Sequence, residues 1–307
     1  MRDAVGRRDG SNSLSKSDIS DGLLDHVSRA LELLHSALDG ARLVPEDDAA
    51  HAPQAVALLS RSVFLCEAAV DLSRTDHRSA AAVLLRPAIE CWIDCCYVLY
   101  CKYEAVLQLA ALGLHQREKL VKAWLGDAPF QELVDALDEL DQVVALGKDA
   151  GMISEGFKAR KSMSVQDRLT AAINCRGAAP SYANVYDYLY RGISTSEIHS
   201  TVALDVHAEY TEDEVMFKVS PTEPFDVTVL IALTTRFACG AGLDVFEVLG
   251  LDSAALVELT NVLDQKLADQ MATINGELVS SPTPEVQRAL EELRQRAGAG
   301  SLPETEN

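Results

Sequence analysis

The sequence contains no 18-residue stretch free of charged side chains, and aromatic residues make up only 6% of its 307 positions. A hydrophobic segment long enough to cross a bilayer is therefore not predicted. Basic residues are also scarce, because 27 lysines and arginines face 47 acidic residues and give a formal net charge of −20. A field of this sign repels phosphate, which excludes indiscriminate binding along nucleic acids but allows a local basic site.

The remaining composition is that of a folded globular protein, with 48% hydrophobic and 24% charged residues. A chain of this length forms one large domain or two small ones, and it needs neither a metal nor a disulfide to fold. The polar segment 1–16 has no apolar stretch after its arginines, so we expect no signal peptide. Seven cysteines are an odd number, and four lie within eleven residues, which favours reduced thiols in the cytoplasm over a disulfide framework.

Apolar residues recur at three- and four-residue steps through most of the chain, which predicts an all-α fold. The first helix follows a cap at Ser17 or Asp18, and further helices are predicted at about 53–73, 76–101, 104–124, 129–147, 165–174, 182–191, 197–206, 225–250, 253–275 and 285–297. Residues 214–219 predict a strand that pairs with 208–210 as a short β-hairpin insert. We therefore expect a helical domain over 17–250, a helical C-terminal extension over 251–297, and disordered tails over 1–16 and 298–307.

The most apolar predicted helix carries a line of charged residues, Arg86, Glu90 and Asp94, at four-residue spacing. This spacing places them within about 80° of one another on one helix face. Pro87 lies beside them and removes a backbone hydrogen bond, which kinks a helix unless a new one begins there. Two interpretations stay open: the line is the solvent edge of the helix, or it is a buried Arg–Glu pair that holds a polar site.

Charge is distributed unevenly along the chain. Residues 151–200 carry six basic and four acidic side chains, whereas residues 201–307 carry six basic and nineteen acidic ones. The positive stretch is where an acidic protein best tolerates an anion, although chance variation along a solvated surface explains it equally well. The acidic C-terminal part either pairs with a basic protein partner or keeps the chain soluble.

Arg191 and His199 form a second candidate site. Gly192 is suited to ending one helix, and Ser194 with Glu197 forms a capping box for the next. His199 is then close to the positive end of a helix, where a lowered pKa keeps its imidazole neutral and able to act as a base. The planar fork of arginine suits a phosphate. Most arginine–histidine pairs at this spacing are structural, and that interpretation also stays open.

Two further sets of residues have a structural interpretation as well as a functional one. Tyr182, Tyr186 and Tyr190 share a helix face beside Arg191, where their rings either stack on bases or pack against the protein. Four cysteines of the apolar helix lack the spacing and partner histidines of a zinc site, so we interpret them as core residues: Cys91, Cys95, Cys96 and Cys101. The common phosphate-loop, dinucleotide, zinc-protease and serine-hydrolase motifs are absent, so no metal or cofactor is predicted.

These motifs resemble a known protein family. The segment 82–92, AVLLRPAIECW, resembles the LLRPxxE helix of an uncharacterised bacterial family with HEPN-like, all-helical character. Tyr190-Arg191 followed by Ser196 to His199 resembles that family's YR and SxxH segments. HEPN domains are helical bundles that dimerise, and many are metal-independent ribonucleases of toxin or phage-defence systems. The resemblance implies an HEPN-like bundle, a homodimer and RNA as substrate.

The resemblance also implies roles for individual residues. His199 is the catalytic residue for attack of the RNA 2′-hydroxyl on phosphorus, Arg191 stabilises the phosphate charge, and Arg86 and Glu90 support the site. Seven residues separate Arg191 from His199, where active members have four to six, and Gly192 occupies a usually polar position. The alternative is a non-enzymatic binding or assembly module with a structural Arg/Glu/His cluster. We expect a cytoplasmic protein without a membrane partner under either hypothesis.

Overall fold

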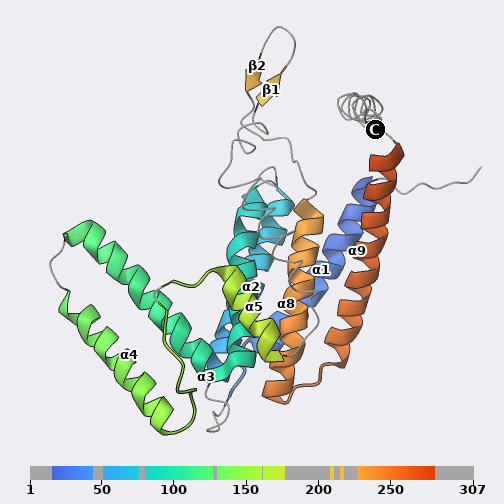
Figure 1. Cartoon of the computed structure of the whole chain (residues 1–307). Helices are drawn as coiled ribbons and strands as arrows, with labels where there is room; N and C mark the ends of the chain where they lie inside the picture. The colour runs from blue at the N-terminus through green and yellow to red at the C-terminus, as the bar shows by residue number, and fades with distance from the viewer. Residues whose placement is uncertain are drawn as a thin grey trace, which may run out of the picture. The chain divides into compact units, whose positions relative to one another are not determined.

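The structure is a computed structural model that describes residues 16–43, 51–75, 80–126, 130–160, 162–176, 208–210, 215–217 and 227–280. The described residues form seven helices and one pair of short strands (Figure 1). The helical fold class predicted from the sequence is confirmed. The described residues up to Leu263 form one compact unit, and those from Asp264 onward form a second.

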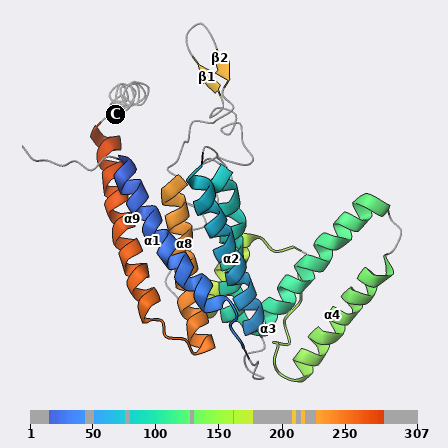
Figure 2. The same cartoon turned by 180° about the vertical axis from the view of Figure 1, so that it is seen from behind.

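Four helices build the core of the first unit: α1 (Lys16–Leu38), α2 (Ala52–Ser73), the first half of α3 (Ala81–Leu125) and α8 (Val227–Leu249), as Figure 2 shows. Each has one apolar face at helical spacing, and burying these faces against one another provides the main stabilisation of the fold. The fully buried side chains include Leu31, Leu59, Trp92 and Ile231. The start of α9 (Ala254–Ser280) adds Leu256 to this core.

The helix α8 is the most apolar of the described helices. It is the one described helix whose length and composition are sufficient to cross a membrane, and 61% of its most apolar window is buried inside the structure. Core helices of soluble proteins have the same composition. The ring of Phe237 from α8 stacks on Trp92 of α3 at 5.4 Å between centroids, so α8 packs here as a core element.

The helix α3 changes direction at Lys102, whose backbone angles are φ 50° and ψ −127°. The predicted break between residues 101 and 104 is therefore confirmed: two helical segments, one on each side of Lys102, meet at a sharp kink and together carry the label α3. Lys102 is the only interior residue of α3 with non-helical angles, so the bend expected at Pro87 is absent. Pro87 lies in the second turn, where its missing N–H leaves the carbonyl of half-exposed Val83 without its usual helical donor.

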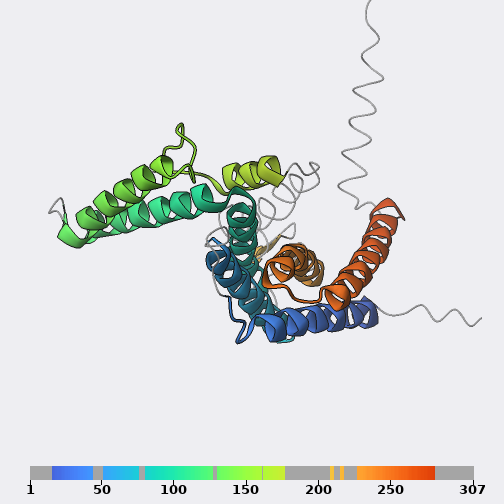
Figure 3. The ribbon, with the colours of Figure 1, turned by 90° about the horizontal axis from the view of Figure 1, so that it is seen from below.

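The second half of α3 and α4 (Gln131–Asp149) run antiparallel as a helical hairpin, seen in Figure 3. The chain then returns to α5 (Val165–Arg176), which packs on α3. Strands β1 (Ala208–Tyr210) and β2 (Val215–Phe217) pair antiparallel. The predicted helices over 182–191, 197–206 and 285–297 lie outside the described residues. So do both predicted tails, except for Lys16, which is the first residue of α1.

Candidate functional site

The charged line on α3 begins with Arg86 and Glu90. The Nε atom of Arg86 lies 3.4 Å from Oε1 of Glu90, and the two side chains are 28% and 34% exposed. The pair is thus half-buried, which matches neither a fully exposed edge nor a buried ion pair. Both side chains therefore keep part of their surface in contact with solvent.

The third member of the line, Asp94, is buried against α5. The Nε atom of Arg168 lies 2.5 Å from Oδ1 of Asp94, and the two side chains are only 9% and 16% exposed. Arg168 also donates a hydrogen bond from Nη1 to the carbonyl of Met163 at 3.0 Å. Burial raises the pKa of Asp94 to about 6, although the charge of Arg168 opposes this shift. The pair therefore fixes α5 on α3 through a partly desolvated interaction.

A second polar link joins α3, α5 and α8. The hydroxyl of Tyr100 donates a hydrogen bond to Oδ2 of Asp244, and Nη2 of Arg176 lies 3.2 Å from the other carboxylate oxygen. The guanidinium of Arg176 also lies 4.9 Å from the centre of the Tyr100 ring. Burial, followed by the neighbouring Cys96 and Asp244, raises the pKa of Tyr100, so its hydroxyl stays protonated as the donor. Tyr100 and Asp244 were not identified as site residues from the sequence.

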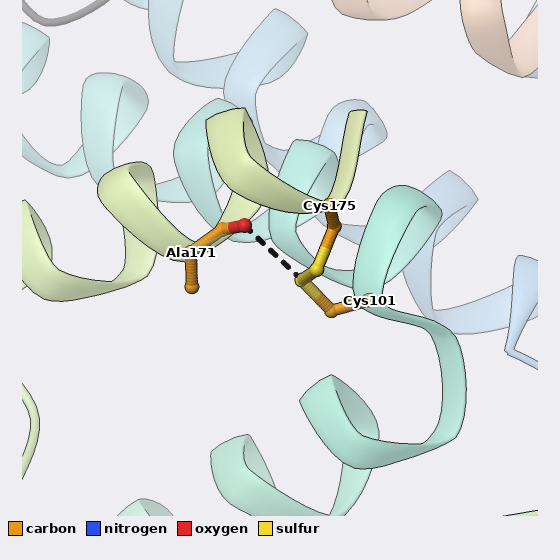
Figure 4. The surroundings of a disulfide bond; sticks show 3 residues. All are labelled: Cys101, Ala171 and Cys175. Atoms are coloured by element: carbon orange, nitrogen blue, oxygen red, sulfur yellow. Dashed lines mark hydrogen bonds between the residues drawn. A yellow bond between two sulfur atoms is a disulfide. The ribbon is translucent and has the colours of Figure 1, made fainter. Parts of the chain in front are cut away.

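Cys101 forms a disulfide with Cys175 of α5 (Figure 4). Its sulfur also lies 3.5 Å from the carbonyl oxygen of Ala171. The interpretation of Cys101 as a reduced core thiol was therefore wrong, because its position at the end of the first half of α3 faces α5 and not the core. The remaining cysteines of this helix are buried free thiols, as predicted: Cys91, Cys95 and Cys96.

Beyond the disulfide, α3 and the segment before α5 enclose an open cleft of about 470 Å³. Gln108 holds this segment in place, because its side chain donates to the carbonyl of Arg160 and accepts from the N–H of the same residue, both at 2.9 Å. Glu104 accepts a hydrogen bond from the N–H of Ser154 at 2.9 Å. The cleft is thus built by side-chain hydrogen bonds to backbone, with buried Gln108 as its main support.

The lining of the cleft combines cations with aromatic rings. Lys158 and Arg160 are exposed, and neither has an ion-pair partner among the residues that the structure describes. Buried Tyr97, half-buried Phe157 and the acidic side chain of Glu104 also line the cleft. Such a surface can bind a phosphate and stack on a planar base. The positive charge of residues 151–200 signalled the two cations in the sequence, whereas nothing in it signalled the cleft.

Four predicted site residues are not placed: Tyr186, Tyr190, Arg191 and His199 lie outside the described residues. The geometry relates Arg86 and Glu90 to each other, and it shows that Asp94, the next charged residue of the line, is bound by Arg168. The positive stretch is also divided by the structure. Arg168 and Arg176 are used in ion pairs with carboxylates, while Lys158 and Arg160 face the cleft.

Comparison with known proteins identifies a family. Neither the curated proteins nor the solved structures include a match to this chain. A model of a family of unknown function, DUF5677, matches residues 54–215, which is more than half of the chain. The matched segment includes the whole of α3, α4 and α5 and therefore the charged line, the disulfide and the cleft. The chain belongs to this family of unknown function, DUF5677.

Proposed function

We propose that the protein is an HEPN-like ribonuclease of the toxin or phage-defence type that cleaves RNA in the cytoplasm without a metal. The observation that carries the proposal is the cleft lined by Lys158 and Arg160 in a chain of net charge −20. A strongly acidic protein repels RNA everywhere except where unpaired cations concentrate. The family resemblance of the helix that carries Arg86 and Glu90 adds support, because that motif accompanies the YR and SxxH segments.

The reaction assigned to Arg191 and His199 is a transesterification within the RNA. His199 accepts the proton of a 2′-hydroxyl, and the 2′ oxygen attacks the adjacent phosphorus. The bond from phosphorus to the 5′ oxygen breaks, the leaving oxygen takes up a proton, and a 2′,3′-cyclic phosphate remains. Arg191 stabilises the charge that develops on the phosphoryl oxygens. In this proposal, the ion pair with Glu90 keeps Arg86 oriented at the edge of the site.

The cleft supplies binding in this proposal. Lys158 and Arg160 bind phosphates of the strand, while the half-buried ring of Phe157 contacts a base. Glu104, on the α3 side, repels a second phosphate and so favours one path of the strand along the cleft. Binding of this kind depends on backbone charge and stacking, so we expect weak sequence preference.

A second candidate function is a non-enzymatic binding or assembly module. The observation that favours it is that most of the basic side chains near α3 form ion pairs within the protein. Arg86, Arg168 and Arg176 each pair with a carboxylate of the same chain, and the last two link helices. Ion pairs of this kind position helices without any chemistry. The two candidates differ in what happens to RNA, which an assay measures directly.

The first test is RNA cleavage by the wild-type protein and by His199→Ala in the presence of a chelator. The expected result is chelator-resistant cleavage that leaves 2′,3′-cyclic phosphate ends and is lost in the variant. Absence of cleavage across varied RNAs, with a lowered melting temperature for His199→Ala, would contradict the ribonuclease proposal and favour the binding module.

The second test concerns the cleft and uses Lys158→Ala combined with Arg160→Ala. Loss of two phosphate contacts should weaken RNA binding and flatten the dependence of log K on log salt by about 1.4, since each contact to a single strand contributes about 0.7. The matched control is Arg29→Ala, an exposed cation of α1 on another surface, which should leave the slope unchanged. An unchanged slope in the cleft variant would show that RNA binds elsewhere.

A further inference from the structure

The helical hairpin of α3 and α4 leaves several large apolar side chains exposed: Leu120, Trp124, Phe130, Val134, Val143 and Leu146. Between residues 112 and 149, Leu133 is the one described side chain that is buried. Yet α4 has an apolar stripe at four-three-four spacing, formed by Leu133, Leu137, Leu140 and Val144. Stripes with this spacing pack in helical bundles. Two helices side by side cover only part of each other's stripe, so the hairpin has half of a bundle core.

An apolar groove marks the open side of the hairpin near its turn. The groove has a volume of about 500 Å³. Its lining includes Trp124, which is 84% exposed, Leu120, which is 59% exposed, and Phe130, which is 42% exposed. A contiguous set of large exposed apolar side chains is typical of a protein interface, because exposing it to water is unfavourable.

The charges of the two hairpin helices are opposite. Residues 114–125 at the end of α3 carry three basic side chains and one acidic one, whereas α4 carries six acidic side chains and one basic one. The groove itself is flanked by Arg117 on the α3 side and by Glu132 on the α4 side. A partner that covers this face favourably must present an acidic helix to α3 and a basic helix to α4, with apolar residues between them.

We propose that the partner is a second copy of this chain, whose hairpin packs on the first as an antiparallel four-helix bundle. In a two-fold arrangement the same patch is used by both copies, so the basic end of α3 in one copy faces the acidic α4 of the other. Leu120 and Trp124 of each copy then fill the groove of its partner. A single sequence thereby provides the apolar, acidic and basic parts that the open face needs.

The size of the hairpin is sufficient for such an interface. Nineteen residues of α4 are about 28 Å long at 1.5 Å per residue, and two adjacent helices are about 20 Å wide. One face therefore buries on the order of 600 Å² per copy, or about 1,200 Å² in total, which is the lower end of the range for specific interfaces. We therefore expect a reversible dimer. This inference is independent of the proposed ribonuclease activity.

The first test measures association of the full-length chain by sedimentation equilibrium. Wild type should dimerise, and Leu120→Glu combined with Trp124→Glu should weaken the dimer by at least about 30-fold, because two charges would enter the apolar groove. Both replaced side chains are exposed in the single chain, so circular dichroism should stay unchanged. The matched control is Phe64→Glu on α2, which is 66% exposed outside the hairpin and should leave the dimer intact.

The second test distinguishes a second copy from a different protein. One variant reverses the α3 end with Arg117→Glu and Lys119→Glu, and another reverses α4 with Asp138→Lys and Glu139→Lys. Each variant alone should dimerise less well than wild type. A mixture of the two should form a heterodimer, because the acidic α3 end of one variant then faces the basic α4 of the other. A monomeric wild type at all concentrations, a dimer unaffected by the groove variant, or no recovery in the mixture would each overturn the proposal. An unaffected dimer would still be compatible with a ribonuclease that associates elsewhere.

Discussion

Replacing Arg168 by methionine should destabilise the protein far more at pH 7.5 than at pH 5. In the wild type, Arg168 and Asp94 are 9% and 16% exposed, so removing the cation leaves a buried carboxylate without its partner. Breaking a buried pair in this way costs about 3–5 kcal/mol. The cost applies only while Asp94 is charged, which makes it dependent on pH.

The direction follows from the pKa of Asp94, which burial raises from 3.8 to about 6 in the folded protein. The folded state therefore binds this proton more tightly than the unfolded chain. The stability from this group is complete below about pH 4 and is lost as the pH rises through 6. Without Arg168 the pKa of Asp94 rises further. The variant therefore continues to lose stability above pH 6, by up to about 1.4 kcal/mol per pH unit. At pH 5 the carboxyl group is mainly protonated in both proteins, and the difference between them shrinks to hydrogen bonds and packing.

The assay is urea denaturation of wild type and Arg168→Met at both pH values. Histidine titrations common to the two proteins cancel in the difference. The matched control is Arg74→Met, whose guanidinium lies 3.8 Å from exposed Asp25 and whose loss should change stability by at most about 1 kcal/mol at either pH. Equal destabilisation of Arg168→Met at the two pH values would refute the reasoning, because it would mean that Asp94 does not change its charge between them.

Three other perturbations have defined outcomes. Reduction of the Cys101–Cys175 bond, which spans 74 residues, should lower the free energy of unfolding measured in urea by up to about 4 kcal/mol. The stability of Cys175→Ser should not depend on reductant. If peptide mapping confirms that the bond is reduced and the stability is unchanged, this prediction is contradicted. Gly242→Val should lower the melting temperature by an amount equivalent to about 1–3 kcal/mol, since a Cβ there would lie 2.6 Å from Cδ2 of Leu34. Gly113→Ala, which meets nothing within 4 Å on a helix, should instead raise stability by about 0.5–1 kcal/mol, and a loss would show that its helix is not formed.

The helices could be predicted from the sequence because their signals are local. The segment 53–73 was predicted with Pro53 in the first turn, and α2 spans Ala52–Ser73. The bend in α3 was predicted between residues 101 and 104 and lies at Lys102. Apolar periodicity gives the buried face of a helix, and caps and glycines give its ends.

The pairing of helices could not be predicted in the same way. Asp94 lies 74 positions from Arg168, and Cys101 lies 74 positions from Cys175. Helical periodicity shows which face of α3 is buried but not which later helix covers it. The clustering of four cysteines on one helix therefore suggested a common core role, although Cys101 faces α5. The cleft was missed for a related reason, because it depends on one glutamine, Gln108, that binds the backbone of Arg160.

The bend at Lys102 makes the second half of α3 a lever arm. The arm from Lys102 to the hairpin turn is about 35 Å long at 1.5 Å per residue, so a rotation of 10° about this residue displaces the far end by about 6 Å. The residues on either side of the pivot are both anchored: Cys101 is bonded to Cys175, and the ring of Tyr103 packs edge-on against His51 at 6.1 Å. A force applied at the hairpin turn is therefore transmitted to α5 and to the start of α2, and cutting the disulfide removes the covalent attachment beside the pivot.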